Sequence, residues 1–185
     1  MKIFSNRKFA FSIAIVAALL ATLLGVRGSL NRLARDVEAM FYGGVYLKDE
    51  GYTQPAIDTH IRRRIDTALR FAASMEGYPE LADGAEALMS ARRSLSEAKS
   101  IRDKFSENEK MQRAFVELAE KARGIELSER DREEVESCSS TFSGAQAAIQ
   151  NSRYNQQAQS FMDGASVLAR ILKPFLFVSQ PQVFA

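Results

Sequence analysis

The chain of 185 residues has no tryptophan, one cysteine, one histidine and four prolines. A single cysteine, Cys138, cannot form a disulfide within the chain, so cysteine usage does not indicate on which side of a membrane the protein lies. One histidine, His60, is too few for a histidine-rich metal site, and we expect it to be a surface residue. These residue types therefore predict no metal centre.

Sequence patterns that carry catalytic or nucleotide-binding chemistry are also missing. The chain contains neither GxGxxG nor GxxxxGK[ST], and it lacks GxSxG, HExxH and CxxC. Adjacent carboxylates such as Glu133 and Glu134 point apart on a helix and do not make an acid–base pair. We expect no enzymatic activity, no catalytic residues and no cofactor. A pair of carboxylates on two facing helices is the arrangement that would overturn this expectation.

Charge of neither sign dominates the composition. The chain has 25 Lys and Arg against 23 Asp and Glu, a formal net charge of +2. Nucleic-acid binding requires a strongly basic face, so we expect no nucleic-acid partner. Charged residues are interspersed with Ala, Leu and Glu, which is typical of helices. The composition therefore predicts an all-α fold.

One long hydrophobic run is present, at residues 9–26, and it carries no charged residue. About 20 apolar residues span a bilayer as a helix, and the range begins near 17. We predict a transmembrane anchor over residues 9–26, after a short N-terminal tail at 1–8. The alternative is a secretory signal peptide, which would leave a secreted helical domain after cleavage. The run is longer than the usual signal core of about 7–15 residues and does not end in a small-residue cleavage site.

Basic residues flank both ends of the run, so the positive-inside rule decides little about orientation. The short N-terminal tail with its charged amine favours a cytoplasmic N-terminus. We therefore expect a single-pass protein of the cell membrane whose helical domain, residues 27–173, faces outside.

Helical periodicity after the run predicts an elongated up-and-down bundle of about four helices. Ser106 with Glu109 and Ser128 with Asp131 match capping boxes. Residues 45–55 are predicted to be a loop connection, and a kinked continuation of the preceding helix is the alternative. The apolar tail 174–185 is predicted to fold back on the bundle or to lie in the membrane interface. The predicted helices cover residues 29–42, 55–76, 79 to about 104 and 106–123, and a last helix of about 34 residues follows Ser128.

Three consecutive arginines, Arg62, Arg63 and Arg64, lie in the middle of the predicted helix 55–76. At 100° per residue they spread over about 200° of the helix circumference, so they cannot share one pocket. We interpret them as a solvated face, with Asp58 paired to Arg62 and Asp66 paired to Arg70 one turn apart. The alternative is contact with anionic lipid headgroups.

The last predicted helix carries apolar residues at alternating spacings of three and four, as in a coiled coil. We expect this seam to face helices of its own domain, and a second copy of the chain is the alternative, so a homo-oligomer is possible. Cys138 lies in the seam and is predicted to be a small buried residue and not a nucleophile. The seam consists of Val135, Cys138, Phe142, Ala145, Ile149 and Ser152.

Three stretches of the chain resemble motifs of the LemA family. Residues 60–66, HIRRRID, resemble a basic Q-L-x-R-R-x-D segment, and residues 91–93, ARR, resemble an A-R motif. Tyr154-Asn155 and Phe161-Met162 resemble a repeated Y-N motif, although Met162 replaces the second asparagine and His60 replaces the glutamine. The positions singled out by this resemblance are Arg63, Arg64, Asp66, Arg92, Tyr154, Asn155 and Phe161.

The resemblance implies a membrane-anchored helical protein of the bacterial envelope, with a role in envelope stress or signalling. Our leading hypothesis is a non-enzymatic interaction or scaffold protein whose partner is an unknown membrane or envelope protein. The alternative is a membrane-tethered sensor or ligand-binding module that relays through helix 29–42. Tyr154 is expected to bury its ring between helices, and a binding role is the alternative.

Overall fold

The computed structural model describes residues 7–172 and Phe184. The predicted tails, 1–8 and 174–185, otherwise lie outside these residues. The described chain is mostly helical, as predicted, and a short β-hairpin is its departure from an all-α fold.

Two compact units make up the described chain. The first contains residues 7–38 and 157–172, and the second contains residues 39–156 with Phe184. Buried side chains of the first unit include Ala34, Val37, Ala158 and Phe161.

Helix α1, Arg7–Gly43, begins the described chain and contains both the predicted anchor and the predicted helix 29–42 without a break. Its segment Ala10–Gly43 is long and apolar enough to cross a membrane, with a mean hydropathy of 2.1 in its most apolar window. A signal sequence near an N-terminus would satisfy the same criterion. Large apolar side chains are exposed around this part of the helix, at Phe11, Ile13, Ile15, Val16, Leu19, Leu20 and Leu24.

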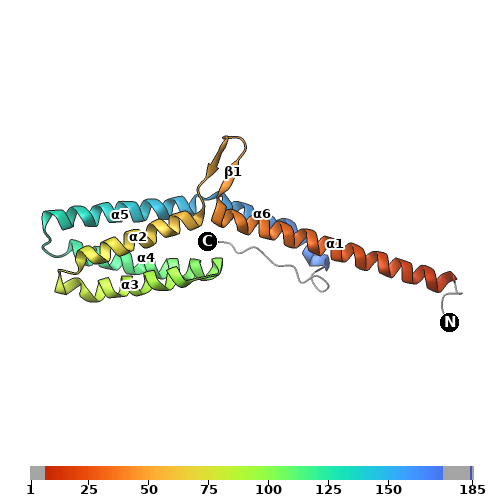
Figure 1. The fold of residues 1–185 in the computed structure, drawn as a ribbon, viewed down its shortest axis with the longest axis horizontal. Helices are drawn as coiled ribbons and strands as arrows, with labels where there is room; N and C mark the ends of the chain where they lie inside the picture. The colour runs from red at the N-terminus through yellow and green to blue at the C-terminus, as the bar shows by residue number, and fades with distance from the viewer. Residues whose placement is uncertain (1–6, 173–183, 185) are drawn as a thin grey trace. The chain divides into compact units, whose positions relative to one another are not determined.

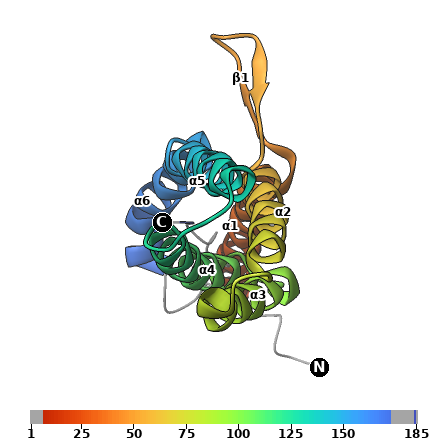
Figure 2. The same ribbon diagram turned by 90° about the vertical axis from the view of Figure 1, so that its left-hand side faces the viewer.

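A β-hairpin replaces the predicted connection at 45–55. Strand β1, Val45–Leu47, pairs antiparallel with β2, Tyr52–Gln54, and the hairpin stands away from helices α2 to α5 of its own unit (Figures 1 and 2). Gly44 and Gly51 have φ of +85° and +69° and allow the chain to enter and turn the hairpin. The prediction of a simple loop was wrong because Gly51 permits the tight turn that pairs β1 with β2, and Gly44 permits the chain to enter β1.

Four helices form the bundle of the second unit (Figures 1 and 2). Helix α2, Ile57–Met75, packs against α3, Ala82–Glu97, and against α5, Glu129–Gln150. Helix α4, Ile101–Arg123, packs mainly against α3, and a 3-10 turn, η2, at Pro79–Leu81 leads into α3.

The bundle core follows the predicted stripes. The ring centroids of Phe71 and Phe115 are 4.8 Å apart, and Phe115 stacks on Phe142 with centroids 3.8 Å apart. These three rings join α2, α4 and α5. The seam of α5 is buried within its own bundle, which confirms the intramolecular reading for the residues from Val135 to Ile149.

The predicted helix start at Ser106 was wrong. Helix α3 ends at Glu97, and α4 begins at Ile101, with Ser100 as its N-cap. The hydroxyl of Ser100 accepts a hydrogen bond from the backbone N–H of Asp103 at 3.0 Å. A serine followed by an acidic residue three positions later thus occurs twice in this segment, and the first occurrence caps the helix.

The predicted last helix of about 34 residues is divided into α5 and α6, Arg153–Leu172. The side chain of Gln54, on strand β2, holds the junction. Its amide donates to the carbonyl of Asn151 at 3.4 Å, and its oxygen accepts from the backbone N–H of Arg153 at 2.8 Å. Because Gln54 is about a hundred residues away in sequence, helical periodicity alone did not reveal the break.

Candidate functional site

Arg64 lies inside the bundle, although its neighbours Arg62 and Arg63 are exposed. It follows Ile61 by three residues and precedes Ala68 by four, so it occupies a position of the buried stripe of α2. The prediction that all three arginines form a solvated face was therefore wrong for Arg64, whose side chain is 0% exposed.

Three carboxamides from α4 and α5 surround the Arg64 guanidinium. One terminal nitrogen donates to Oδ1 of Asn108 and, at 2.5 Å, to Oε1 of Gln146. The other terminal nitrogen donates to Oε1 of Gln112. The guanidinium carbon lies 4.0 Å from the ring centroid of Phe142, a cation–π contact. Neutral dipoles and an aromatic face thus surround this charge.

Burial lowers the pKa of Arg64 to about 10, and the nearby charge of Glu109 opposes this shift. Arg64 therefore remains a cation at neutral pH. Taking a charge out of water costs several kcal/mol unless compensating contacts are made. In the described part of the chain, Nε of Arg64 and Nδ2 of Asn108 are buried donors without a hydrogen-bond partner. The network is therefore incomplete at two atoms.

A cavity of about 340 Å³ adjoins this network at Asn108 and Gln146. Its walls come from α4, α5, the start of α6 and Phe184. They are formed by Phe105, Asn108, Glu109, Gln146, Ile149, Gln150, Asn155 and Phe184. Phe184 is buried against the rings of Phe41 and Phe105, with centroid distances of 5.5 and 5.4 Å, so this residue of the C-terminal tail packs on the bundle.

A second polar cluster surrounds Asp58 on α2. Its carboxylate accepts from Nε of Arg62 at 2.8 Å, as predicted, and also pairs with Lys104 of α4. Burial opposes ionisation of Asp58, but the hydrogen bonds from Lys104 and Arg62 outweigh it and lower the pKa below the ordinary 3.8. A cavity of about 360 Å³ lies beside this cluster, and Asp66 contributes to its wall.

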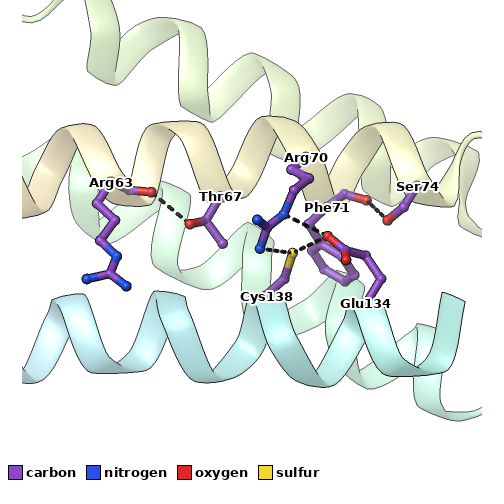
Figure 3. Close-up of polar contacts among 7 residues, drawn as sticks. All are labelled: Arg63, Thr67, Arg70, Phe71, Ser74, Glu134 and Cys138. Carbon is purple, nitrogen blue, oxygen red and sulfur yellow. Dashed lines mark hydrogen bonds and ion pairs between the residues drawn. The ribbon is translucent and has the colours of Figure 1, made fainter. Parts of the chain in front are cut away.

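The third polar cluster joins α2 to α5 (Figure 3). Arg70 pairs with Glu134 at 2.7 Å and not with Asp66 as predicted. It also donates to the sulfur of Cys138, whose thiol donates to Glu134. Cys138 is buried as predicted, and burial raises the pKa of its thiol to about 11. A protonated thiol is a poor nucleophile, so this cluster joins the helices and lacks an activated cysteine.

The motif positions singled out in the sequence lie in different places. Arg63 and Asp66 are exposed on α2, whereas Nε of Arg92 donates to the carbonyl of Ile65 at 3.2 Å. Tyr154 is fully buried, as expected, with its ring centroid 5.5 Å from that of Phe41.

Of these positions, Arg64 and Asn155 are brought to one site. Arg64 binds Asn108 and Gln146, and these two residues line the cavity with Asn155. Phe161 is buried in the first unit.

Sequence reasoning missed Asn108, Gln112 and Gln146. Asn108 lies seven residues after Ile101 and three before Met111, so it is a polar residue on the apolar stripe of α4. This polar interruption of the apolar stripe was the sequence feature that could have identified Asn108 as a site residue.

The described residues contain no group of three or more His, Cys, Asp and Glu side chains arranged to hold a metal ion.

No protein-family model, curated protein or solved structure matches the chain.

Proposed function

We propose that this chain is a single-pass membrane protein of LemA-like type whose helical bundle acts by binding partners and not by catalysis. The exposed apolar surface of α1 carries the proposal. Seven large apolar side chains from Phe11 to Leu24 are exposed and spread over about 220° of the helix circumference. Burying such a surface in a bilayer removes it from water. This lowers the free energy by about 25 cal/mol for each Å² of apolar area buried.

The hairpin supports an interaction role. Tyr46 on β1 and Tyr52 on β2 are 61% and 47% exposed on an element that stands away from the bundle (Figures 1 and 2). Exposed tyrosines combine an apolar ring with a hydroxyl and are enriched in protein interfaces. The hairpin is therefore the surface where we expect an envelope or membrane protein partner, or a second copy of the chain, to bind.

Membrane fractionation tests the anchor. The full chain is expected in the membrane pellet after an alkaline carbonate wash. Leu19→Arg should reduce that fraction, since an arginine at the centre of a span costs about 2.5–3.5 kcal/mol on insertion. Leu33→Arg, at an exposed apolar position of the same helix beyond the hydrophobic run, is the matched control. A soluble product about 2–3 kDa smaller than the full chain would identify a cleaved signal peptide and contradict the anchor.

Photocrosslinking tests the interaction surface. A photoreactive residue at Tyr46 should give discrete adducts in intact membranes, and one at Val116, an exposed apolar position on α4, should not. An adduct of twice the chain mass would identify a homo-oligomer. Equal, diffuse labelling from both positions would contradict a partner surface on the hairpin.

Protease accessibility tests whether the bundle faces outside. Digestion of the bundle in intact cells would place it outside, and protection until the cells are lysed would place it in the cytoplasm.

A second candidate function is ligand binding, and the cavity beside Asn108 favours it. Ligand pockets usually occupy about 300–1,000 Å³ and combine apolar walls with a few placed polar groups. The cavity of about 340 Å³ has phenylalanine walls and four carboxamides, so it has the size and the lining of a site for a small molecule.

A further inference from the structure

Three of the carboxamides that line the cavity have their oxygens occupied by protein donors. Arg64 donates to Oδ1 of Asn108 and to Oε1 of Gln146. The backbone N–H of Phe184 donates to Oδ1 of Asn155 at 3.1 Å. Because each amide carries its oxygen on one arm and its NH₂ on the other, these contacts fix the orientation of all three. The groups left to face a ligand are hydrogen-bond donors.

Asn108 is the residue that points most directly to a ligand. Its side chain is 0% exposed, and its Nδ2 has no hydrogen-bond partner among the described residues. A buried donor without an acceptor is costly, and native structures contain few of them. Asn108 lines the cavity, so a ligand oxygen that reaches Nδ2 from there would satisfy this donor.

The charges around the cavity define the ligand further. Arg64 lies behind Asn108 and Gln146, and the contacts described for its guanidinium are to carboxamide oxygens and a ring. Glu109 already supplies negative charge near this buried cation, and a negatively charged ligand group at the amide donors would add to it. Glu109 also lines the cavity, and it makes no hydrogen bond or ion pair within the described chain. Its carboxylate favours a positive ligand group.

We propose that the cavity binds a small zwitterion of the α-amino acid class. The carboxylate accepts from the amides of Asn108, Gln146 and Asn155, and the ammonium group faces Glu109. Phe105, Ile149 and Phe184 supply apolar wall for a side chain. A dicarboxylate or a phosphate satisfies the amide donors equally well but meets repulsion from Glu109, so a zwitterion fits both ends of the cavity. This inference deepens the ligand-binding candidate and rests on it, and it is independent of the anchor.

Thermal unfolding and calorimetry of the full chain in detergent micelles test the inference. Each of the twenty standard amino acids is added singly at millimolar concentration, and a ligand of the folded state must raise the melting temperature by mass action. The tightest amino acid is then compared with its methyl ester and with the same carboxylic acid lacking the amine. Each analogue should bind about tenfold more weakly or worse, because each loses one charge-assisted contact.

Two substitutions locate the site. Asn108→Asp keeps an oxygen for Arg64 but replaces the free donor with a negative charge, so it should fold and lose amino-acid binding by about tenfold or more. Asn155→Asp keeps the acceptor for Phe184 and is the second test if the first variant does not fold. Glu109→Gln should lower affinity for the amino acid toward that of the amine-free acid. Glu120→Gln, at an exposed position of α4, is the control.

The outcomes separate this inference from the broader ligand-binding candidate. Unchanged amino-acid affinity in folded Asn108→Asp would overturn the assignment of the site. Tighter binding of the amine-free acid than of the amino acid would overturn the zwitterion but retain a ligand-binding cavity. If neither the amino acids nor their amine-free acids change the melting temperature, the inference and the ligand-binding candidate both fail.

Discussion

The guanidinium of Arg64 donates a hydrogen bond to the side-chain oxygen of Asn108, and both side chains are completely buried. The two residues are 44 positions apart and lie on α2 and α4. With Gln146 of α5, they form a buried polar connection between α2, α4 and α5. A hydrogen-bonded pair inside a core penalises any helix register that separates it. The network therefore selects one arrangement of these three helices.

The planar fork of Arg64 is required to reach amides on two helices, and this predicts an effect of Arg64→Lys. A lysine ammonium lacks the fork and the flat face that contacts Phe142. We expect the free energy of unfolding to fall by about 2–4 kcal/mol, because buried amide oxygens lose their donors. Urea unfolding of the full chain in micelles measures this. Arg63→Lys, exposed one residue earlier, should change stability by less than about 0.5 kcal/mol. Equal effects of the two substitutions would contradict a structural role for the buried network.

The ion cluster at Asp58 predicts a specific acid dependence of stability. The folded protein lowers the pKa of Asp58 below the ordinary 3.8, so the unfolded chain binds the proton more readily. The carboxylate therefore contributes stability above about pH 3.8, and the contribution is lost as the pH falls through the folded value. Asp58→Asn should lower the free energy of unfolding at pH 7 by about 1–3 kcal/mol, with a smaller difference at pH 3.

Asp66→Asn is the matched control for this experiment, since Asp66 is exposed on the same helix. Its unfolding curves should follow the wild type between pH 3 and pH 7. A constant deficit of Asp58→Asn across that range would show that the cluster acts through packing and not through ionisation.

The sequence was sufficient for features that depend on local pattern. The stripes of α2 and α5 predicted Ile61, Phe142 and the burial of Cys138. The cap at Ser128 is confirmed, since its hydroxyl accepts from the backbone N–H of Asp131 at 3.1 Å. Each of these features is encoded within a few turns of one helix, where spacing and capping chemistry determine the outcome.

Features that depend on distant residues were not predictable in this way. Arg64 was assigned to a solvated face because its partners, Asn108 and Gln146, become neighbours only when α4 and α5 pack on α2. The junction between α5 and α6 depends on Gln54 in the hairpin. A single sequence gives the helical face of a residue, but the partner across the bundle is a property of the fold.

Gly44 predicts a test of the hairpin. A Cβ at this position would collide with the backbone carbonyl of Gln54, and the φ of +85° is itself unfavourable for alanine. Gly44→Ala should therefore lower the free energy of unfolding by more than the roughly 1–2 kcal/mol that a left-handed conformation alone costs. Gly51→Ala isolates the conformational cost, because Gly51 also has positive φ but a Cβ there meets nothing within 4 Å. Equal losses from both substitutions would contradict the close approach at Gln54.

The start of α4 can be tested by removing each of the two serines that match a capping pattern. Ser100 accepts from the N–H of Asp103, so Ser100→Ala should lower the free energy of unfolding by about 1 kcal/mol. Ser106 is exposed within α4, where alanine has the higher helix propensity, so Ser106→Ala should leave stability unchanged or raise it by less than about 0.7 kcal/mol. Urea unfolding of the two variants distinguishes the alternatives directly. A loss at Ser106 and none at Ser100 would move the helix start to the later serine, and Lys104 would then no longer lie in α4 to reach Asp58.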